Sequence, residues 1–85
     1  MKKVTIYSGD PCPFCAAAKA LLKTKDVEIE EFDIWKDPAK AKEMLQKTNG
    51  ARSIPQIFIG DHYIGGNDQL QAANNDGTLD ELLKD

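Results

Sequence analysis

The sequence alternates short runs typical of strands with longer runs typical of helices, and this alternation limits the folds open to it. Residues 4–7 are β-branched or aromatic and predict a strand. Residues 13–25 place apolar side chains at positions i, i+3, i+4, i+7 and i+8, which is the spacing of an amphipathic helix. Residues 28–34 predict a second strand. Since two strands joined by a helix pair in parallel through a right-handed crossover, these residues predict a parallel pair.

The middle of the chain predicts a second helix and a hairpin. Asp37 and Pro38 suit the N-cap and the first turn of a helix over residues 38–47. Residues 56–64 contain two short apolar runs separated by Gly60 and one further residue, which predicts a β-hairpin. Because hairpin strands are antiparallel, the sheet must be mixed.

The last third of the chain predicts helix only. Asn67 is expected to cap a third helix, and Thr78 opens a capping-box pattern ahead of a last short helix. The predicted order is β-α-β-α-β-β-α, an α/β fold whose mixed four-stranded sheet carries helices on both faces. With 85 residues the chain suits a single domain over residues 1–85.

Composition and charge exclude several classes of function. No run approaches the ~18 apolar residues that a membrane-spanning helix needs. Eleven basic residues against fourteen acidic ones give a net charge of −3, so the chain lacks the basic surface of a nucleic-acid-binding protein. No secretory signal peptide follows Lys2 and Lys3, so we expect a cytoplasmic protein, in which thiols are normally reduced.

The motif that carries chemistry is Cys12-Pro13-Phe14-Cys15, at the junction of the first strand and the first helix. Backbone N–H groups in the first helical turn have no internal partner, so those of Phe14 and Cys15 are expected to stabilise a Cys12 thiolate and lower its pKa. Cysteines three residues apart at a helix start have Cα atoms roughly 5 Å apart, which suits a disulfide. We therefore assign Cys12 as the nucleophile and Cys15 as the resolving thiol.

Two other interpretations of the cysteine pair stay open from the residues alone. Free cysteines are often buried in a core as small apolar side chains. The second interpretation is that the pair forms half of a zinc site, which a second chain would complete. Within one chain, Cys12, Cys15 and His62 supply three ligands at most where a structural zinc site takes four, so we expect no metal site.

The chain resembles the glutaredoxins, specifically the small bacterial ones with two active-site thiols. The motifs that carry the resemblance occur in the family's order and spacing and cover nearly all of the chain: Tyr7-Ser8, residues 12–15, residues 53–59 and residues 65–68. The resemblance implies a thioredoxin-like fold and a glutathione-dependent thiol–disulfide oxidoreductase that reduces protein disulfides and glutathione mixed disulfides. Glutathione would be a co-substrate, and no cofactor would be tightly bound.

The resemblance also implies a glutathione site. Pro55 matches a cis-proline that faces the thiols, and the backbone of Ile54 would pair with the cysteinyl part of glutathione. Asn67 and Asp68 match the helix start that receives the γ-glutamyl end. The remaining residues assigned to this site are Phe14, Ser53 and Gly66. Ordinary structural interpretations remain: a trans turn before Pro55, a hairpin ended by glycines, and an acidic residue that only complements the helix dipole.

Three basic residues are candidates for a contact with the glycyl carboxylate of glutathione: Lys40, Lys42 and Arg52. A solvated lysine face explains the first two equally well. Trp35 follows the second predicted strand and is either a packing residue or part of a partner surface.

Three departures from the family pattern and two rival functions remain. One departure is Asn67, which stands where relatives often have cysteine or another small polar residue. Phe14 stands where relatives commonly have tyrosine, and Asp10 lies two residues before Cys12, which predicts a less acidic thiol than in the family's most acidic members. The rivals are an electron donor reduced by thioredoxin reductase and a dimer that carries an iron–sulfur cluster held by Cys12 and glutathione. Relatives with clusters mostly have Cys-Gly-Phe-Ser, and Cys15 argues against that function. We expect a monomer whose partners are glutathione and disulfide-bonded or glutathionylated proteins.

Overall fold

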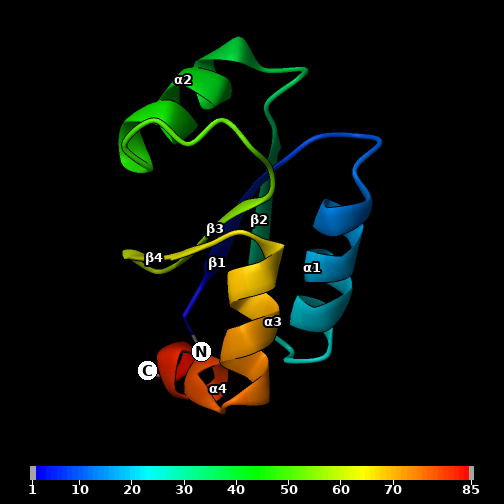
Figure 1. Ribbon diagram of the computed structural model, residues 1–85, viewed down its shortest axis with the longest axis vertical. Coiled ribbons are helices and arrows are strands. Elements are labelled where there is room, and N and C mark those ends of the chain that lie inside the picture. Colours follow the sequence, from blue (N-terminus) through cyan, green and yellow to red (C-terminus); the bar gives the residue numbers. More distant parts are fainter. Residues whose placement is uncertain (1, 85) are drawn as a thin grey trace.

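The computed structural model describes residues 2–84 and contains one mixed sheet in the order β2-β1-β3-β4 (Figure 1). β1 pairs in parallel with β2 and antiparallel with β3, and β3 pairs antiparallel with β4. The elements, in chain order, are β1 (Val4–Ser8), α1 (Pro13–Lys23), β2 (Ile29–Asp33), α2 (Pro38–Lys47), β3 (Gln56–Ile59), β4 (His62–Gly65), α3 (Asn67–Asn75) and α4 (Thr78–Leu83). The predicted order and the mixed sheet are confirmed. The longest helix in residues 2–84 has 11 residues, so none is long and apolar enough to cross a membrane.

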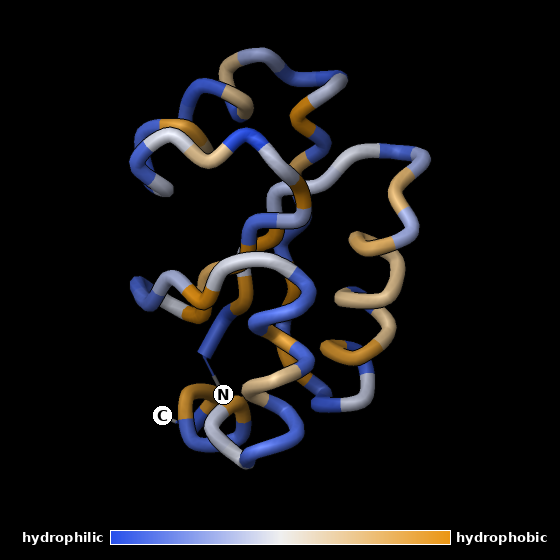
Figure 2. Tube along the Cα trace, in the orientation of Figure 1, coloured by the Kyte–Doolittle hydropathy of each residue, from blue (hydrophilic) through white to orange (hydrophobic). Residues whose placement is uncertain are grey.

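Helices cover both faces of the sheet, as predicted, and each face has its own apolar cluster (Figure 1). Side chains alternate along β1, so that Val4 and Ile6 pack toward α1 and α3 while Tyr7 packs toward α2. Figure 2 shows hydrophobic residues concentrated on the central strands and along α1. The larger cluster, under α1, α3 and α4, holds the sheet against the helix that carries both cysteines.

The smaller cluster is closed by a polar contact between the sheet and α2. Tyr7 is fully buried, and its hydroxyl donates a hydrogen bond to Glu43. Burial and the neighbouring carboxylate both raise the pKa of Tyr7 far above its usual value, so this hydroxyl stays protonated and remains a donor. Lys40 lies 3.9 Å from the centre of the Phe32 ring and also pairs with Glu43. These contacts fix α2 on β1 and β2.

Two predicted helix caps are wrong. The N-cap of α3 is Gly66, and Asn67 is the first helical residue. The Gly66 N–H is satisfied by the side-chain oxygen of Gln69, which accepts it at 2.9 Å. The N-cap of α4 is Gly77, not Thr78. Gly77 has a φ of +84°, which favours glycine, whereas Gly66 has an extended backbone (φ −98°). In both cases the polar residue that follows the glycine already has helical geometry.

Candidate active site

The two cysteines lie where the sequence predicts them, at the N-terminus of α1. β1 ends at Ser8, residues 9–11 form a loop, and Cys12 is the N-cap of α1 with extended backbone angles (φ −153°, ψ 100°). Pro13 occupies the first helical position, where a missing N–H costs nothing. Cys12 and Cys15 form a disulfide with their Cα atoms 5.2 Å apart, in agreement with the predicted separation.

The two sulfur atoms have different surroundings. Cys15, in the first turn of α1, is 1% exposed, whereas Cys12 is partly exposed. The Cys15 N–H donates to the Cys12 sulfur at 3.2 Å. The sequence predicts a second donor, the Phe14 N–H, but among residues 2–84 no hydrogen bond joins it to that sulfur. Only Cys12 can therefore meet a large disulfide directly, while Cys15 can attack what is attached to Cys12.

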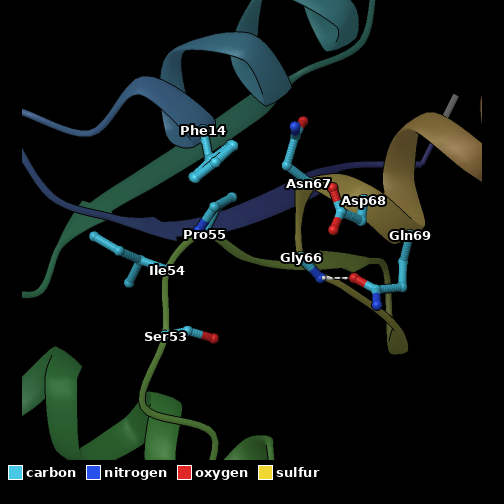
Figure 3. Close-up of a pocket in the computed structure, with 8 residues that line it drawn as sticks. All are labelled: Phe14, Ser53, Ile54, Pro55, Gly66, Asn67, Asp68 and Gln69. Carbon is cyan, nitrogen blue, oxygen red and sulfur yellow. Dashed lines mark hydrogen bonds between the residues drawn. The ribbon is translucent and has the colours of Figure 1, made fainter.

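An open groove of about 270 Å³ lies between the start of α1, the segment before β3 and the start of α3 (Figure 3). Figure 3 shows the Phe14 ring above Pro55 on one side and Gly66, Asp68 and Gln69 on the other. The lining residues are Phe14, Ser53, Ile54, Pro55, Gly66, Asn67, Asp68 and Gln69. The structure thus gathers in one groove all seven residues that the family resemblance assigns to glutathione.

Gln69 is the lining residue that the sequence reasoning missed. Its side-chain oxygen accepts the Gly66 N–H, which fixes the entry into α3 at the edge of the groove. The available signal was a glutamine at the third helical position, the position of the second residue of a capping box. That signal became readable only once Gly66 was known to be the N-cap.

The backbone at the floor of the groove depends on small residues. Pro55 is buried, and the Ile54–Pro55 bond is cis, as the family resemblance implies; the Asp10–Pro11 bond is also cis, which the sequence did not predict. A Cβ on Gly66 would lie 3.3 Å from the Pro55 carbonyl oxygen. Gly65 has a φ of +111°, a conformation that favours glycine. The two glycines let β4 turn into α3 directly beside the proline.

The electrostatics of the groove are set by the start of α3. The first helical turn presents backbone N–H groups and the positive end of the helix dipole, which suit a carboxylate. The same turn carries the exposed carboxylate of Asp68, which suits an ammonium group. A ligand with both groups on one carbon, such as the end of a γ-glutamyl peptide, matches this pair of charges.

None of the three predicted basic residues lines the groove. Lys40 pairs with Glu43 at 3.4 Å and lies over Phe32, so its ammonium is engaged on α2. Lys42 is exposed on α2, and Arg52 is exposed in the segment that precedes Ser53. A contact between any of them and a ligand carboxylate stays a prediction.

A polar network supports the strand that leads into the active-site loop. The buried Ser8 hydroxyl donates to Glu31 at 2.6 Å, and Lys19 of α1 pairs with the same carboxylate oxygen at 2.8 Å. The hydrogen bond from Lys19 lowers the pKa of Glu31 below its usual value, and the hydrogen bond from Ser8 makes the second-largest contribution. The network therefore joins β1, β2 and α1 just below the cysteines.

Replacing Glu31 with glutamine should lower the free energy of unfolding at pH 7 by less than about 1 kcal/mol, because the carboxylate is 39% exposed and screened by solvent. A lowered pKa stabilises the folded state above the unfolded pKa and stops doing so as pH falls through the folded pKa. Urea unfolding from pH 7 to pH 3 should therefore show the difference between variant and parent shrinking, with Glu28→Gln as the control. A difference independent of pH would mean that the charge of Glu31 plays no part.

Comparison with known proteins agrees with this geometry. The family model described as glutaredoxin matches residues 4–64. A probable glutaredoxin of Synechocystis sp. is 48% identical over 81 residues, covering 95% of this chain and 92% of the relative. The solution structure of glutaredoxin from Brucella melitensis superposes with a TM-score of 0.82 at 44% identity, covering 99% of this chain and 90% of the other. A buckwheat glutaredoxin–glutathione complex superposes with a TM-score of 0.83 at 26% identity, covering 94% and 74%. These superpositions confirm the thioredoxin-like fold.

Proposed function

Since the chain belongs to the glutaredoxin family of thiol–disulfide oxidoreductases, we propose that glutathione reduces it and that its substrates are protein disulfides and glutathione mixed disulfides. The observation that carries the proposal is the groove beside the cysteines, which ends at the start of α3. Support also comes from the buckwheat relative, whose structure contains glutathione. We further propose that the protein acts as a cytoplasmic monomer, in a compartment where glutathione and reduced thiols are present.

Glutathione would lie along the groove in an extended conformation. Its γ-glutamyl end has an ammonium group for the Asp68 carboxylate and a carboxylate for the N–H groups at the start of α3. Its cysteinyl backbone would pair with that of Ile54, as an added strand does. The Phe14 ring and Pro55 would flank its sulfur, with Ser53, Gly66 and Asn67 completing the walls. The glycyl carboxylate would point to the side of Arg52, Lys40 and Lys42.

With a glutathione mixed disulfide, Cys12 alone completes the reaction. The Cys12 thiolate attacks the glutathione sulfur, which releases the substrate as a thiolate and leaves glutathione attached to Cys12. A second glutathione thiolate then attacks the attached glutathione sulfur. Oxidised glutathione leaves and Cys12 returns to the thiolate, so the two electrons come from the two glutathione molecules.

With a protein disulfide, both cysteines are needed. Cys12 attacks one sulfur and forms a mixed disulfide with the protein, and the second protein sulfur leaves as a thiolate. The Cys15 thiolate then attacks Cys12 and releases the first sulfur. The product is the Cys12–Cys15 disulfide, which is the state of the structure described above. Two glutathione molecules then reduce it through a Cys12–glutathione adduct.

The test of this function is reduction of the mixed disulfide of glutathione and 2-mercaptoethanol, coupled to glutathione reductase. In that assay, Asp68→Asn should raise the KM for glutathione about tenfold and leave kcat within twofold. The substitution removes a charge-assisted contact that glutathione makes equally in the bound ground state and in the transition state. Asp61→Asn, which changes an exposed aspartate in the turn between β3 and β4, is the matched control and should behave as the parent.

Two results would overturn the proposed function. The first is a protein that glutathione does not reduce but that thioredoxin reductase and NADPH do. The second is visible absorbance of an iron–sulfur cluster in protein purified without oxygen, together with no activity in the coupled assay. An unchanged KM in Asp68→Asn would overturn only the assigned role of Asp68.

A further inference from the structure

Trp35 is 57% exposed, yet its backbone is firmly held. It follows β2, and the N–H of Ile34 donates to the Ser8 carbonyl at 2.9 Å, which extends the pairing of β1 and β2 by one residue. The Asp33 side chain accepts the N–H groups of Trp35 at 2.9 Å and Lys36 at 3.2 Å, which closes a tight turn. The indole therefore extends into solvent from a backbone that hydrogen bonds hold in place.

The indole ring lies against the loop that leads to the cysteines. A Cβ added to Gly9 would come within 2.6 Å of two ring carbons of Trp35 and within 2.9 Å of the Ile54 Cδ1 atom. Gly9 is buried. A glycine at this position thus makes room for the ring, and Trp35 and Ile54 meet over the backbone of Gly9, three residues before Cys12.

This aromatic surface lies on the other side of Ile54 from the groove. The Ile54 side chain points away from Gly66 and Asp68 in Figure 3, and Trp35 is not among the residues that line the groove. The γ-glutamyl half of a glutathione molecule, which reaches from the cysteines to the start of α3, therefore leaves the indole uncovered. A polypeptide is different, because residues on both sides of its cysteine extend beyond the sulfur.

We propose that Trp35 is a specificity-determining residue that binds an apolar side chain next to the cysteine of a disulfide-bonded protein substrate. The inference rests on the proposed function and names the class of protein disulfide that the site prefers. Two observations select this occupant: the indole is continuous with the site through Ile54, and it is exposed on the opposite side of Ile54 from the start of α3, where residues next to a substrate cysteine can reach it. Tryptophan is among the residues that most often contribute a large share of the binding energy at protein interfaces.

The contact would act while the substrate is attached to Cys12. The Cys12 thiolate attacks one sulfur of the peptide disulfide, the other peptide leaves as a thiolate, and Cys15 then displaces the attached peptide. The dithiol supplies both electrons and becomes the Cys12–Cys15 disulfide. An apolar side chain against the indole stabilises the approach to this mixed disulfide, so it raises kcat/KM for that peptide.

The test compares two tryptophan-free octapeptides, each a disulfide-linked dimer, with leucine or serine on both sides of the cysteine. The parent should reduce the leucine peptide with a kcat/KM about tenfold above that for the serine peptide. Trp35→Ala should bring this ratio below twofold and leave reduction of the glutathione–mercaptoethanol mixed disulfide within twofold. Lys36→Ala, in the same turn, should keep the parent's ratio.

A parent that does not prefer the leucine peptide, or a Trp35→Ala variant that loses all three substrates equally, would overturn the proposal. A second measurement keeps Trp35 in place and so does not depend on the folding of Trp35→Ala. It uses the fluorescence of Trp35, which is the single tryptophan of the chain. In Cys15→Ser protein, the leucine peptide trapped on Cys12 should lower acrylamide quenching of Trp35 at least twofold relative to trapped glutathione. Equal quenching would also overturn it. Failure with the glutathione mixed disulfide itself would instead overturn the proposed function.

Discussion

Replacing Cys12 with serine should abolish reduction of both protein disulfides and glutathione mixed disulfides, by at least about a thousandfold in kcat/KM. Both reactions begin with attack by the sulfur at the N-terminus of α1, and a serine hydroxyl at that position is neither ionised at neutral pH nor able to exchange with a disulfide. Serine is a good N-cap, so the helix should form as before. The loss therefore reports on chemistry rather than on folding.

The measurement is the coupled glutathione assay together with turbidity or fluorescence detection of protein disulfide reduction, with circular dichroism to check the fold. In the reduced parent, iodoacetamide at pH 7 should also modify Cys12 before Cys15, because only Cys12 is accessible and supported by a backbone N–H. Residual activity above a tenth of the parent's, or faster alkylation of Cys15, would show that the roles of the two cysteines are reversed.

Replacing Cys15 with serine should separate the two reactions. Reduction of protein disulfides should fall at least a hundredfold, since no internal thiol remains to release the protein attached to Cys12. Reduction of glutathione mixed disulfides should stay within about threefold, because that cycle uses Cys12 and external glutathione only. Cys15 is buried but its side chain is close in size to serine, so the packing under α1 should change little.

The two substrates must be assayed on the same preparation, with the trapped protein–Cys12 adduct identified by mass. Accumulation of that adduct in Cys15→Ser, and its absence in the parent, is the expected signature of a resolving thiol. Equal loss of both activities would mean that Cys15 supports the fold or the Cys12 thiolate instead of resolving the intermediate.

Local sequence signals were sufficient where the responsible groups are neighbours in the chain. Asp37 and Pro38 predict the start of α2 correctly, because a side-chain cap and a fixed φ act within one turn. The strand at residues 56–59 is correct to the residue. The starts of α3 and α4 were missed by one residue, because a glycine is the N-cap of each helix and the polar residue after it is already the first helical residue.

The active site divides in the same way. Cys12 and Cys15 form a reactive pair through spacing and position on one helix, which the sequence contains in full. The groove brings together Phe14, residues 53–55 and residues 66–69, which come from three separate segments. Their grouping was available beforehand only through resemblance to a family. Lys40 illustrates the limit, since its engagement with Glu43 and Phe32 depends on how α2 lies on the sheet.

The sequence by itself determined the order of the elements and the position of a thiol pair at a helix start, because periodicity, capping and spacing act over a few residues. Only the tertiary structure decided which segments meet at Pro55 and that the indole of Trp35 lies over Gly9 beside Ile54. Those relations depend on the packing of two layers of helices on one sheet. No local pattern encodes a distance between residues that lie twenty or more positions apart.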